Sequence, residues 1–217
     1  MKLIKKLFQL IMKTAFLLVL ANVIYFGLSG WIMYRQCIVE TPVETVVQEI
    51  QNRDDYISLN EISSDYIEAL LESEDSVFYQ HHGFNPISTL QALMTNISEG
   101  YFAEGGSTIT QQLAKNLYFD FEKKIERKVA ELFMAWEIEN ALEKDEILEV
   151  YLNVIYYGEN CYGIEEASQH YYGVSAMDLN GEQIEALVVT VKSPNNYNPN
   201  VLTDSSSLAR VIEYINR

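Results

Sequence analysis

The hydrophobic pattern sets the first 35 residues apart from the rest of the chain. Thr14 to Tyr34 is a run of 21 residues without a charge, and about 20 apolar residues are enough for a helix to cross the hydrocarbon core of a membrane. Lysines at positions 2, 5, 6 and 13 precede the run, and Arg35 is the only cation close after it. Because positive charge marks the cytoplasmic side, residues 1–35 are predicted to be a transmembrane signal anchor. The N-terminus would lie in the cytoplasm and the remaining chain outside.

A cleaved signal peptide is the alternative interpretation of this segment. Gly27, Leu28 and Ser29 match the small-x-small pattern at which signal peptides are cut. The apolar run, however, is longer than the roughly 7–15 residues of a signal-peptide core. Its length therefore favours a retained anchor.

Beyond the anchor, apolar residues recur mainly with helical spacing. Residues 36–60 are predicted to be a connector with one short ordered piece around 43–50. Gly100 to Gly106 is rich in helix breakers and is predicted to be a loop that carries Tyr101 and Phe102. Helices are predicted over residues 65–74, 86–97, 108–118, 122–141 and 145–157. Few segments alternate with period two, so residues 61–217 are predicted to form one mainly α domain.

The same pattern predicts where helices begin and which faces they bury. Asp65 with Glu68, and Thr108 with Gln111, have the spacing of capping boxes. In the segment 122–141, four large apolar residues share one face and are predicted to point into the core: Ile125, Val129, Leu132 and Trp136. Four charged residues share the other side: Lys124, Arg127, Lys128 and Glu131.

The chain beyond Arg35 is strongly acidic. It contains all 31 acidic residues but only ten of the 15 basic ones, which gives a net charge of −21. Proteins that bind nucleic acid present a basic surface, so this balance argues against a nucleic-acid partner. Net charge also supplies no long-range attraction for an anionic substrate, which makes a local cluster of cations more informative.

Cys37 and Cys161 are the only cysteines. Nothing in the sequence supports a disulfide between them, and their pairing stays open. The chain has no Cys/His spacing typical of a zinc site.

Three polar clusters contain the residues best suited to chemistry. Glu74 to Gly83 combines acids with histidines, Gly105 to Asn116 is a glycine pair followed by hydroxyls and amides, and Arg127 to Glu131 joins two cations to a carboxylate. One carboxylate can move a proton while cations hold a departing negative charge. Together the clusters suit displacement at a sugar carbon that bears an anionic leaving group. Singly, each has an ordinary interpretation: an exposed helix end, a capped turn, or a solvated ion pair contributing under ~1 kcal/mol.

In this order the clusters resemble the peptidoglycan glycosyltransferases of glycosyltransferase family 51. The family string E-D-x-x-F-x-x-H-x-G is met from Glu74 to Gly83, and G-G-S-T-I-T-Q-Q-x-x-K-N from Gly105 to Asn116. The string R-K-x-x-E is met from Arg127 to Glu131. A fourth, K-x-x-I-L-x-x-Y-L-N-x-x-Y-x-G, is met from Lys144 to Gly158. The resemblance covers about residues 60–200.

The match is looser elsewhere. Ala186 to Pro199 reads ALVVTVKSPNNYNP, where the family usually has A-L-L-A-x-L-P-x-x-P before Tyr-x-Pro, and the segment after Gly158 lacks a common glycine. Asn85 stands where an acidic residue often follows H-x-G-x. No Ser-x-x-Lys string occurs, so a transpeptidase domain of the penicillin-binding type is not expected in this chain. The chain ends at Arg217 inside a predicted helix, which suggests a shortened domain.

The resemblance implies a lysozyme-like, two-lobed helical domain that acts on lipid II at the outer face of the bacterial cytoplasmic membrane. The 4-hydroxyl of an acceptor lipid II attacks the anomeric carbon of a lipid-linked glycan chain, undecaprenyl pyrophosphate leaves, and a β-1,4 linkage forms with inversion. Glu74 matches the family's general base. Glu131 matches the second glutamate, which is linked to a metal ion or to organisation of the leaving group. Mg²⁺ or Mn²⁺ is the expected cofactor.

The resemblance also assigns the substrate contacts. The cations that would hold the pyrophosphate are Lys115, Arg127 and Lys128. Further substrate-binding residues implied are Asp75, His81, Ser107, Thr108, Gln111, Gln112 and Asn116. The region of Tyr101 and Phe102 resembles the family's membrane-proximal segment, so its apolar residues are expected to touch lipid. Expected partners are lipid II, the growing lipid-linked glycan chain, the membrane and other proteins of cell-wall synthesis.

Two other classes of function stay open. A hydrolase of finished peptidoglycan also uses two carboxylates, but it does not need the cations around Glu131. A membrane-anchored scaffold of wall synthesis whose catalysis has decayed is the second, and the intact motif residues argue against it. Use of lipid II by the purified protein separates both from a polymerising enzyme.

Overall fold

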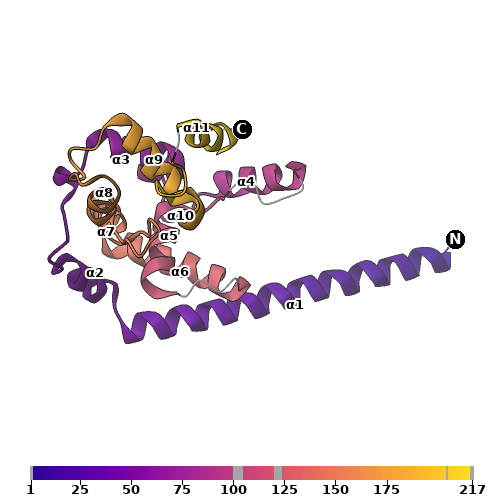
Figure 1. The fold of residues 1–217 in the computed structure, drawn as a ribbon. Coiled ribbons are helices and arrows are strands. Elements are labelled where there is room, and N and C mark those ends of the chain that lie inside the picture. Colours follow the sequence, from indigo (N-terminus) through magenta and orange to yellow (C-terminus); the bar gives the residue numbers. More distant parts are fainter. Residues whose placement is uncertain (1, 100–104, 120–123, 204, 216–217) are drawn as a thin grey trace.

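The computed structural model describes residues 2–99, 105–119, 124–203 and 205–215; Tyr101 and Phe102 of the predicted loop lie outside these ranges. Regular structure in the described part is helical (Figure 1), which confirms the mainly α prediction. Two 3₁₀ turns, Leu59–Glu61 and Phe78–Gln80, separate some of these helices. The α-helices are α1 (Lys2–Glu40), α2 (Val43–Gln51), α3 (Ser64–Asp75), α4 (Pro86–Glu99), α5 (Ile109–Tyr118), α6 (Ile125–Ala141), α7 (Lys144–Val154), α8 (Ile164–Tyr172), α9 (Gly181–Lys192), α10 (Pro194–Tyr197) and α11 (Ser205–Ile215).

The predicted helix 145–157 stops early, at Val154, because the chain turns back on itself there. Tyr156 and Tyr162 form an antiparallel bridge, and the amide of Tyr157 donates to the carbonyl of Cys161 over 2.9 Å. The predicted segments 86–97 and 108–118 correspond closely to α4 and α5. The thiols of Cys37 and Cys161 are both free.

The core lies where α5 packs on α6 and α7 and where α3 packs on α9. The hydroxyls of two buried tyrosines, Tyr66 of α3 and Tyr157 after α7, share a hydrogen bond. Other fully buried side chains include Phe78, Leu113, Met134, Ile138 and Tyr151. The core therefore packs together the helices that contain or adjoin the three polar clusters, α3, α5 and α6.

Helix α1 is longer than a membrane is thick and is also part of the domain. Its 39 residues extend about 58 Å at 1.5 Å per residue, against a hydrocarbon core of about 30 Å. By length and composition it could span a membrane, and its N-terminal part extends away from the body (Figure 1). Its C-terminal part packs along α6. Tyr34 donates from its hydroxyl to Glu137 over 2.6 Å, and the ring of Phe133 packs edge-on against Trp31.

The prediction of which face of α6 points into the core is wrong. Ile125 and Trp136 are each 59 % exposed, whereas Ala130, Met134 and Ile138 are buried. Small and flexible side chains allow α5 to approach closely on that side, while Val129 lies against α1 at Gly30. Packing on these two sides leaves the stripe of Ile125, Leu132 and Trp136 facing outward.

The predicted capping box at Asp65 is also wrong. Helix α3 begins one residue earlier, with Ser63 at the N-cap position and no side-chain cap. Asp65 instead lies in the first turn, where its negative charge interacts favourably with the positive end of the helix dipole. At α5 the prediction is half right: Thr108 is the N-cap and accepts from the amide of Gln111 over 3.2 Å, but the Gln111 side chain binds Gly83 instead.

Helix α4 leaves an apolar face without a partner in the described chain. Its large exposed side chains recur every three or four residues: Ile87, Leu90, Met94 and Ile97. The helix protrudes from the body toward the same side of the view as the free end of α1 (Figure 1). Pro86 to Ser98 contains no charged residue. Asn85 explains the start of this helix, because its side-chain oxygen accepts from the amides of Ile87 and Ser88, each over 3.1 Å.

Candidate active site

Glu74 lies at the C-terminal end of α3 with its carboxylate held from two other helices. Its side chain is 8 % exposed, and the Lys192 ammonium at the end of α9 lies 2.8 Å from Oε1. Gln112 of α5 donates from Nε2 to Oε2 over 2.7 Å. Lys192 is itself anchored, because its Nζ donates to the carbonyl of Ser73 over 2.6 Å. The carboxylate is thus nearly buried, oriented and paired with one cation.

A buried tyrosine fixes the amide that faces Glu74. The Tyr151 hydroxyl donates to Gln112 Oε1 over 2.9 Å, so the NH₂ side of the amide points at the carboxylate. Burial, followed by the charge of Glu74, raises the pKa of Tyr151 well above its ordinary value. The phenol therefore stays protonated at neutral pH and remains a donor.

Asp75 and His81 lie beside the site but bind each other. The His81 ring nitrogen Nε2 lies 2.9 and 3.0 Å from the two Asp75 oxygens. Asp75 also accepts from the amide of Ile109, the first residue of α5, over 3.0 Å. The carboxylate therefore ties the end of α3 to the N-terminus of α5, where a negative charge is favoured.

The side chains of Thr108 and Gln111 also form hydrogen bonds within the protein. Gly83 has φ +71°, a left-handed conformation that glycine tolerates best, and its carbonyl accepts from both side chains. The distances are 2.8 Å from Thr108 Oγ1 and 3.1 Å from Gln111 Nε2. Both side chains are buried. Of the predicted polar contacts in this loop and helix, Ser107, Gln112 and Asn116 remain partly accessible.

Glu131 is the centre of a second, cationic cluster on α6. Its side chain is only 2 % exposed, and its two oxygens bind different cations: Arg127 on Oε1 and Lys128, at 2.9 Å, on Oε2. Lys128 also donates to Ser107 Oγ over 2.6 Å. Three of the four predicted charged residues, Arg127, Lys128 and Glu131, thus gather beside the Gly105–Ser107 loop, while Lys124 is exposed.

Lys115 connects the two carboxylates electrostatically. Burial is the largest influence and lowers the pKa of its ammonium; Glu131 and, more weakly, Glu74 raise it, while Arg127 and Lys128 lower it. Lys115 is three residues after Gln112 on α5 and so shares its helix face. The two glutamates and the four cations Lys115, Arg127, Lys128 and Lys192 therefore form one site across α3, α5, α6 and α9.

The residues around Glu131 do not fit a metal ion held by the protein alone. A hard divalent cation takes about six oxygen ligands, whereas both Glu131 oxygens are already bound to cations. The described residues contain no group of three His, Cys, Asp or Glu side chains that could hold a metal.

The sequence pattern did not identify two contributors to this arrangement. Lys192 falls in the segment where the motif match is loose, and no local signal relates it to Glu74, 118 positions earlier. Glu139 is buried and accepts from Thr110 over 2.5 Å and from Lys144 over 2.8 Å. Lys144 opens the fourth motif string, so a partner for it was to be expected, but spacing alone does not say which.

Comparison with known proteins gives consistent matches. The family profile described as Transglycosylase matches residues 41–215. The chain is 43 % identical over 143 residues to penicillin-binding protein 1A of Vibrio cholerae, covering 66 % of this chain and 17 % of that protein. It is 43 % identical over 145 residues to penicillin-binding protein 1A/1B of Bacillus subtilis, covering 66 % and 16 %. A monofunctional glycosyltransferase of Staphylococcus epidermidis is 36 % identical over 179 residues, covering 79 % of this chain and 63 % of that protein. The chain thus spans about a sixth of the two penicillin-binding proteins and less than two thirds of the third relative.

Proposed function

The chain belongs to the transglycosylase family of peptidoglycan glycosyltransferases, and from this premise we propose that it polymerises lipid II into β-1,4 glycan strands. The acceptor's 4-hydroxyl oxygen forms a bond to the donor's anomeric carbon, and the bond from that carbon to the pyrophosphate oxygen breaks. Glu74 takes the hydroxyl proton. Undecaprenyl pyrophosphate leaves with the electron pair, and a single displacement inverts the configuration.

The observation that carries this proposal is the oriented carboxylate of Glu74 in one site with Lys115, Arg127 and Lys128. A sugar hydroxyl is a very weak acid, so its proton must be removed as the new bond forms, by a base within hydrogen-bond reach. The Lys192 ammonium, 2.8 Å from Oε1, fixes the direction of one carboxylate oxygen. Gln112 holds the other oxygen in place.

The cations on α5 and α6 would receive the pyrophosphate. Arg127 suits bidentate contact with phosphate oxygens, whereas the ammonium groups of Lys115 and Lys128 act as point charges. Glu131 forms ion pairs with both Arg127 and Lys128. It would therefore hold these cations in position before the leaving group develops its charge. A Mg²⁺ or Mn²⁺ ion that takes part would be held by oxygens of the bound pyrophosphate rather than by the residues around Glu131.

The membrane would bring the substrate to this site. The lysines before α1 predict an outer position for the domain, and the apolar face of α4 suits shallow contact with lipid. Since the substrates carry their own lipid chains, an active site built partly on α6, which packs against α1, would meet them at the membrane surface. We propose the outer face of a bacterial cytoplasmic membrane as the location.

The test is polymerisation of labelled lipid II by the full chain in detergent, with products resolved by gel. We expect glycan ladders from the native chain and none from Glu74→Gln, since a general base contributes about 10²–10⁴-fold. Glu72→Gln is the matched control: Glu72 is exposed on the same helix, and its loss should leave the ladders unchanged. Circular dichroism checks that both variants fold.

Two outcomes would redirect the proposal. Ladders from folded Glu74→Gln would remove Glu74 from the role of base. No product from the folded native chain, with lipid II still bound, would favour the scaffold, and cleavage of finished peptidoglycan would favour the hydrolase.

A further inference from the structure

Helix α1 has a seven-residue repeat on a face that the described part of the domain leaves mostly uncovered, with Ser29 partly buried. One line of small or polar residues is spaced by seven positions: Ala15, Asn22, Ser29 and Gln36. A neighbouring line of large residues, three positions later in each repeat, is apolar: Leu18, Tyr25, Ile32 and Val39. The two lines share one face of the helix and would occupy the a and d positions if two such helices packed in parallel with a seven-residue repeat. We call these eight residues the pairing face.

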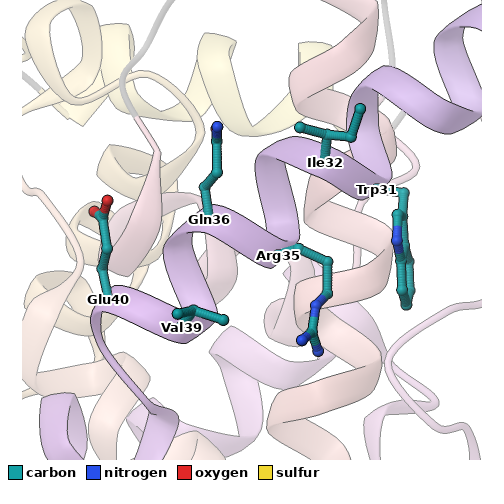
Figure 2. Close-up of a pocket in the computed structure, with 6 residues that line it drawn as sticks. All are labelled: Trp31, Ile32, Arg35, Gln36, Val39 and Glu40. Atoms are coloured by element: carbon teal, nitrogen blue, oxygen red, sulfur yellow. The ribbon is translucent and has the colours of Figure 1, made fainter.

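The contact with α6 uses a different side of α1. Gly30 and Tyr34 meet α6, and Cys37 lies against the carbonyl of Tyr118. Ile32 remains 56 % exposed and Val39 68 % exposed. Figure 2 shows the shallow hollow there, lined entirely by side chains of α1: Trp31, Ile32, Arg35, Gln36, Val39 and Glu40. A second helix can therefore approach the pairing face without displacing α6.

The polar side chain of Asn22 favours contact between this face and another helix. It lies eight positions into the uncharged run, about 12 Å along the helix, and so within the hydrocarbon core. Its Nδ2 donates to the Leu18 carbonyl of its own helix over 2.8 Å, which leaves its acceptor oxygen to be satisfied. Unsatisfied polar groups are unfavourable in lipid, and Asn side chains there commonly bond across helices. Thr14, by contrast, donates its single hydroxyl proton to the Leu10 carbonyl over 3.0 Å.

We propose that α1 pairs in parallel with α1 of a second copy of this chain through the pairing face. Like a positions meet in a parallel pair, so Asn22 would bond Asn22 of the other copy, and Gln36 would bond Gln36. Arg35 and Glu40 occupy g and e positions five residues apart, the spacing that forms salt bridges between parallel helices. Both helices offer the same two charges, so the contact is self-complementary, as a twofold dimer requires. This pairing does not depend on the proposed enzymatic activity.

Cysteine crosslinking in the membrane tests the predicted face. Leu17 and Leu18 are neighbours with the same exposure, 61 %, but only Leu18 belongs to the pairing face. The full chain would be placed in phosphatidylethanolamine–phosphatidylglycerol vesicles with Leu18→Cys or, as the matched control, Leu17→Cys. The parental chain with its native Cys37 and Cys161 gives the baseline. We expect oxidation to give a dimer with Leu18→Cys and only the baseline amount with Leu17→Cys, unchanged when lipid is added in excess.

The polar contacts are tested by energy transfer between labelled copies in the same vesicles. Asn22→Leu should reduce the dimer constant about threefold or more, whereas Val23→Leu, one position later, 63 % exposed and outside the pairing face, should leave it unchanged. Arg35→Glu should weaken pairing, and adding Glu40→Arg should restore it. Equal crosslinking from positions 17 and 18, or energy transfer no greater than that of randomly mixed monomers, would overturn the proposal.

Discussion

At the scale of single residues, the carboxylate of Glu74 is held in a place that excludes most water, with its side chain 8 % exposed. The phenols of Tyr66, Tyr151 and Tyr157, which lie near enough to feel its charge, bring no positive charge. Lys192 makes direct contact with Oε1, while Lys115 acts from farther away. Lys192 is therefore the cation that fixes the direction of the carboxylate by direct contact.

Replacing Lys192 should impair the chemical step more than substrate binding. We expect Lys192→Gln to lower kcat for lipid II polymerisation by about tenfold or more, part of the 10²–10⁴-fold that a positioned base provides, with KM little changed. Lys192→Arg keeps the charge and should recover most of kcat. Initial rates over a range of lipid II concentrations measure both constants. A rise in KM with kcat intact would place Lys192 in substrate binding instead.

The lowered pKa of Lys115 predicts a pH dependence. A lysine whose pKa is lowered loses its proton, and with it the charge that would hold the pyrophosphate, at a lower pH than an ordinary lysine. Activity should therefore decline on the alkaline side, and Lys115→Arg should move this decline to higher pH because arginine stays charged. Rates measured from pH 7 to pH 11 test this in the folded range. The same alkaline decline in the Arg variant would assign it to another group.

The motif strings brought Glu74, Gln112, Lys115 and Glu131 together correctly, because each lies at a helix end or on a helix face that local spacing predicts. Lys192 could not be found in this way. Its ion pair exists only because α9 packs on α3. The spacing of apolar residues in either helix does not predict which helix it packs against. Residues joined by tertiary packing over more than 100 positions need the fold.

At the scale of elements, α6 shows why an apolar stripe does not identify the core. The helix is apolar or small on three sides, and which side becomes buried depends on what packs there. Ala130 and Met134 lie in the core, while Val129 and Phe133 meet α1. The sequence predicted α1 as an anchor followed by a connector, so it offered no partner for a second face of α6. The bounds of α4 and α5 were predicted well because caps and breakers act locally, whereas α7 ended early where a tertiary turn begins.

The close approach of α1 and α6 at Gly30 gives a prediction about coupling between anchor and active site. A Cβ at Gly30 would lie 2.6 Å from Val129 Cβ and 2.9 Å from the Glu126 carbonyl oxygen, so α1 must shift. We expect Gly30→Ala to lower the free energy of unfolding by about 1–3 kcal/mol, the usual effect of overpacking. Polymerisation should fall with it, because Arg127 and Lys128 belong to the same turn of α6.

Gly27→Ala is the control, since nothing lies within 4 Å of its Cβ position. Thermal unfolding of the full chain in detergent measures both, and equal stability of the two variants would show that α1 can move freely on α6.

At the scale of the whole molecule, the proposed function requires a strongly acidic domain to bind an anionic substrate. The residues beyond Arg35 carry a net charge of −21, so the long-range field repels lipid II, while the cluster of Lys115, Arg127 and Lys128 attracts it only at short range. These two effects respond differently to salt. The screening length falls from about 30 Å at 0.01 M to about 10 Å at 0.1 M, which removes most of the repulsion but little of the contact attraction.

We therefore expect kcat/KM for lipid II to rise between 0.01 and 0.1 M KCl, opposite to the decline seen when a positively charged surface steers an anion. Above this range, loss of the contact ion pairs should reverse the trend. Initial rates in uncharged detergent micelles measure the effect without a contribution from lipid charge. MgCl₂ at matched ionic strength is the control: an additional rise with Mg²⁺ would show a cation carried in by the pyrophosphate, whereas equal rates would assign the rise to screening. A decline in kcat/KM from the lowest KCl concentration upward would mean that the cationic cluster controls the approach of substrate despite the net charge.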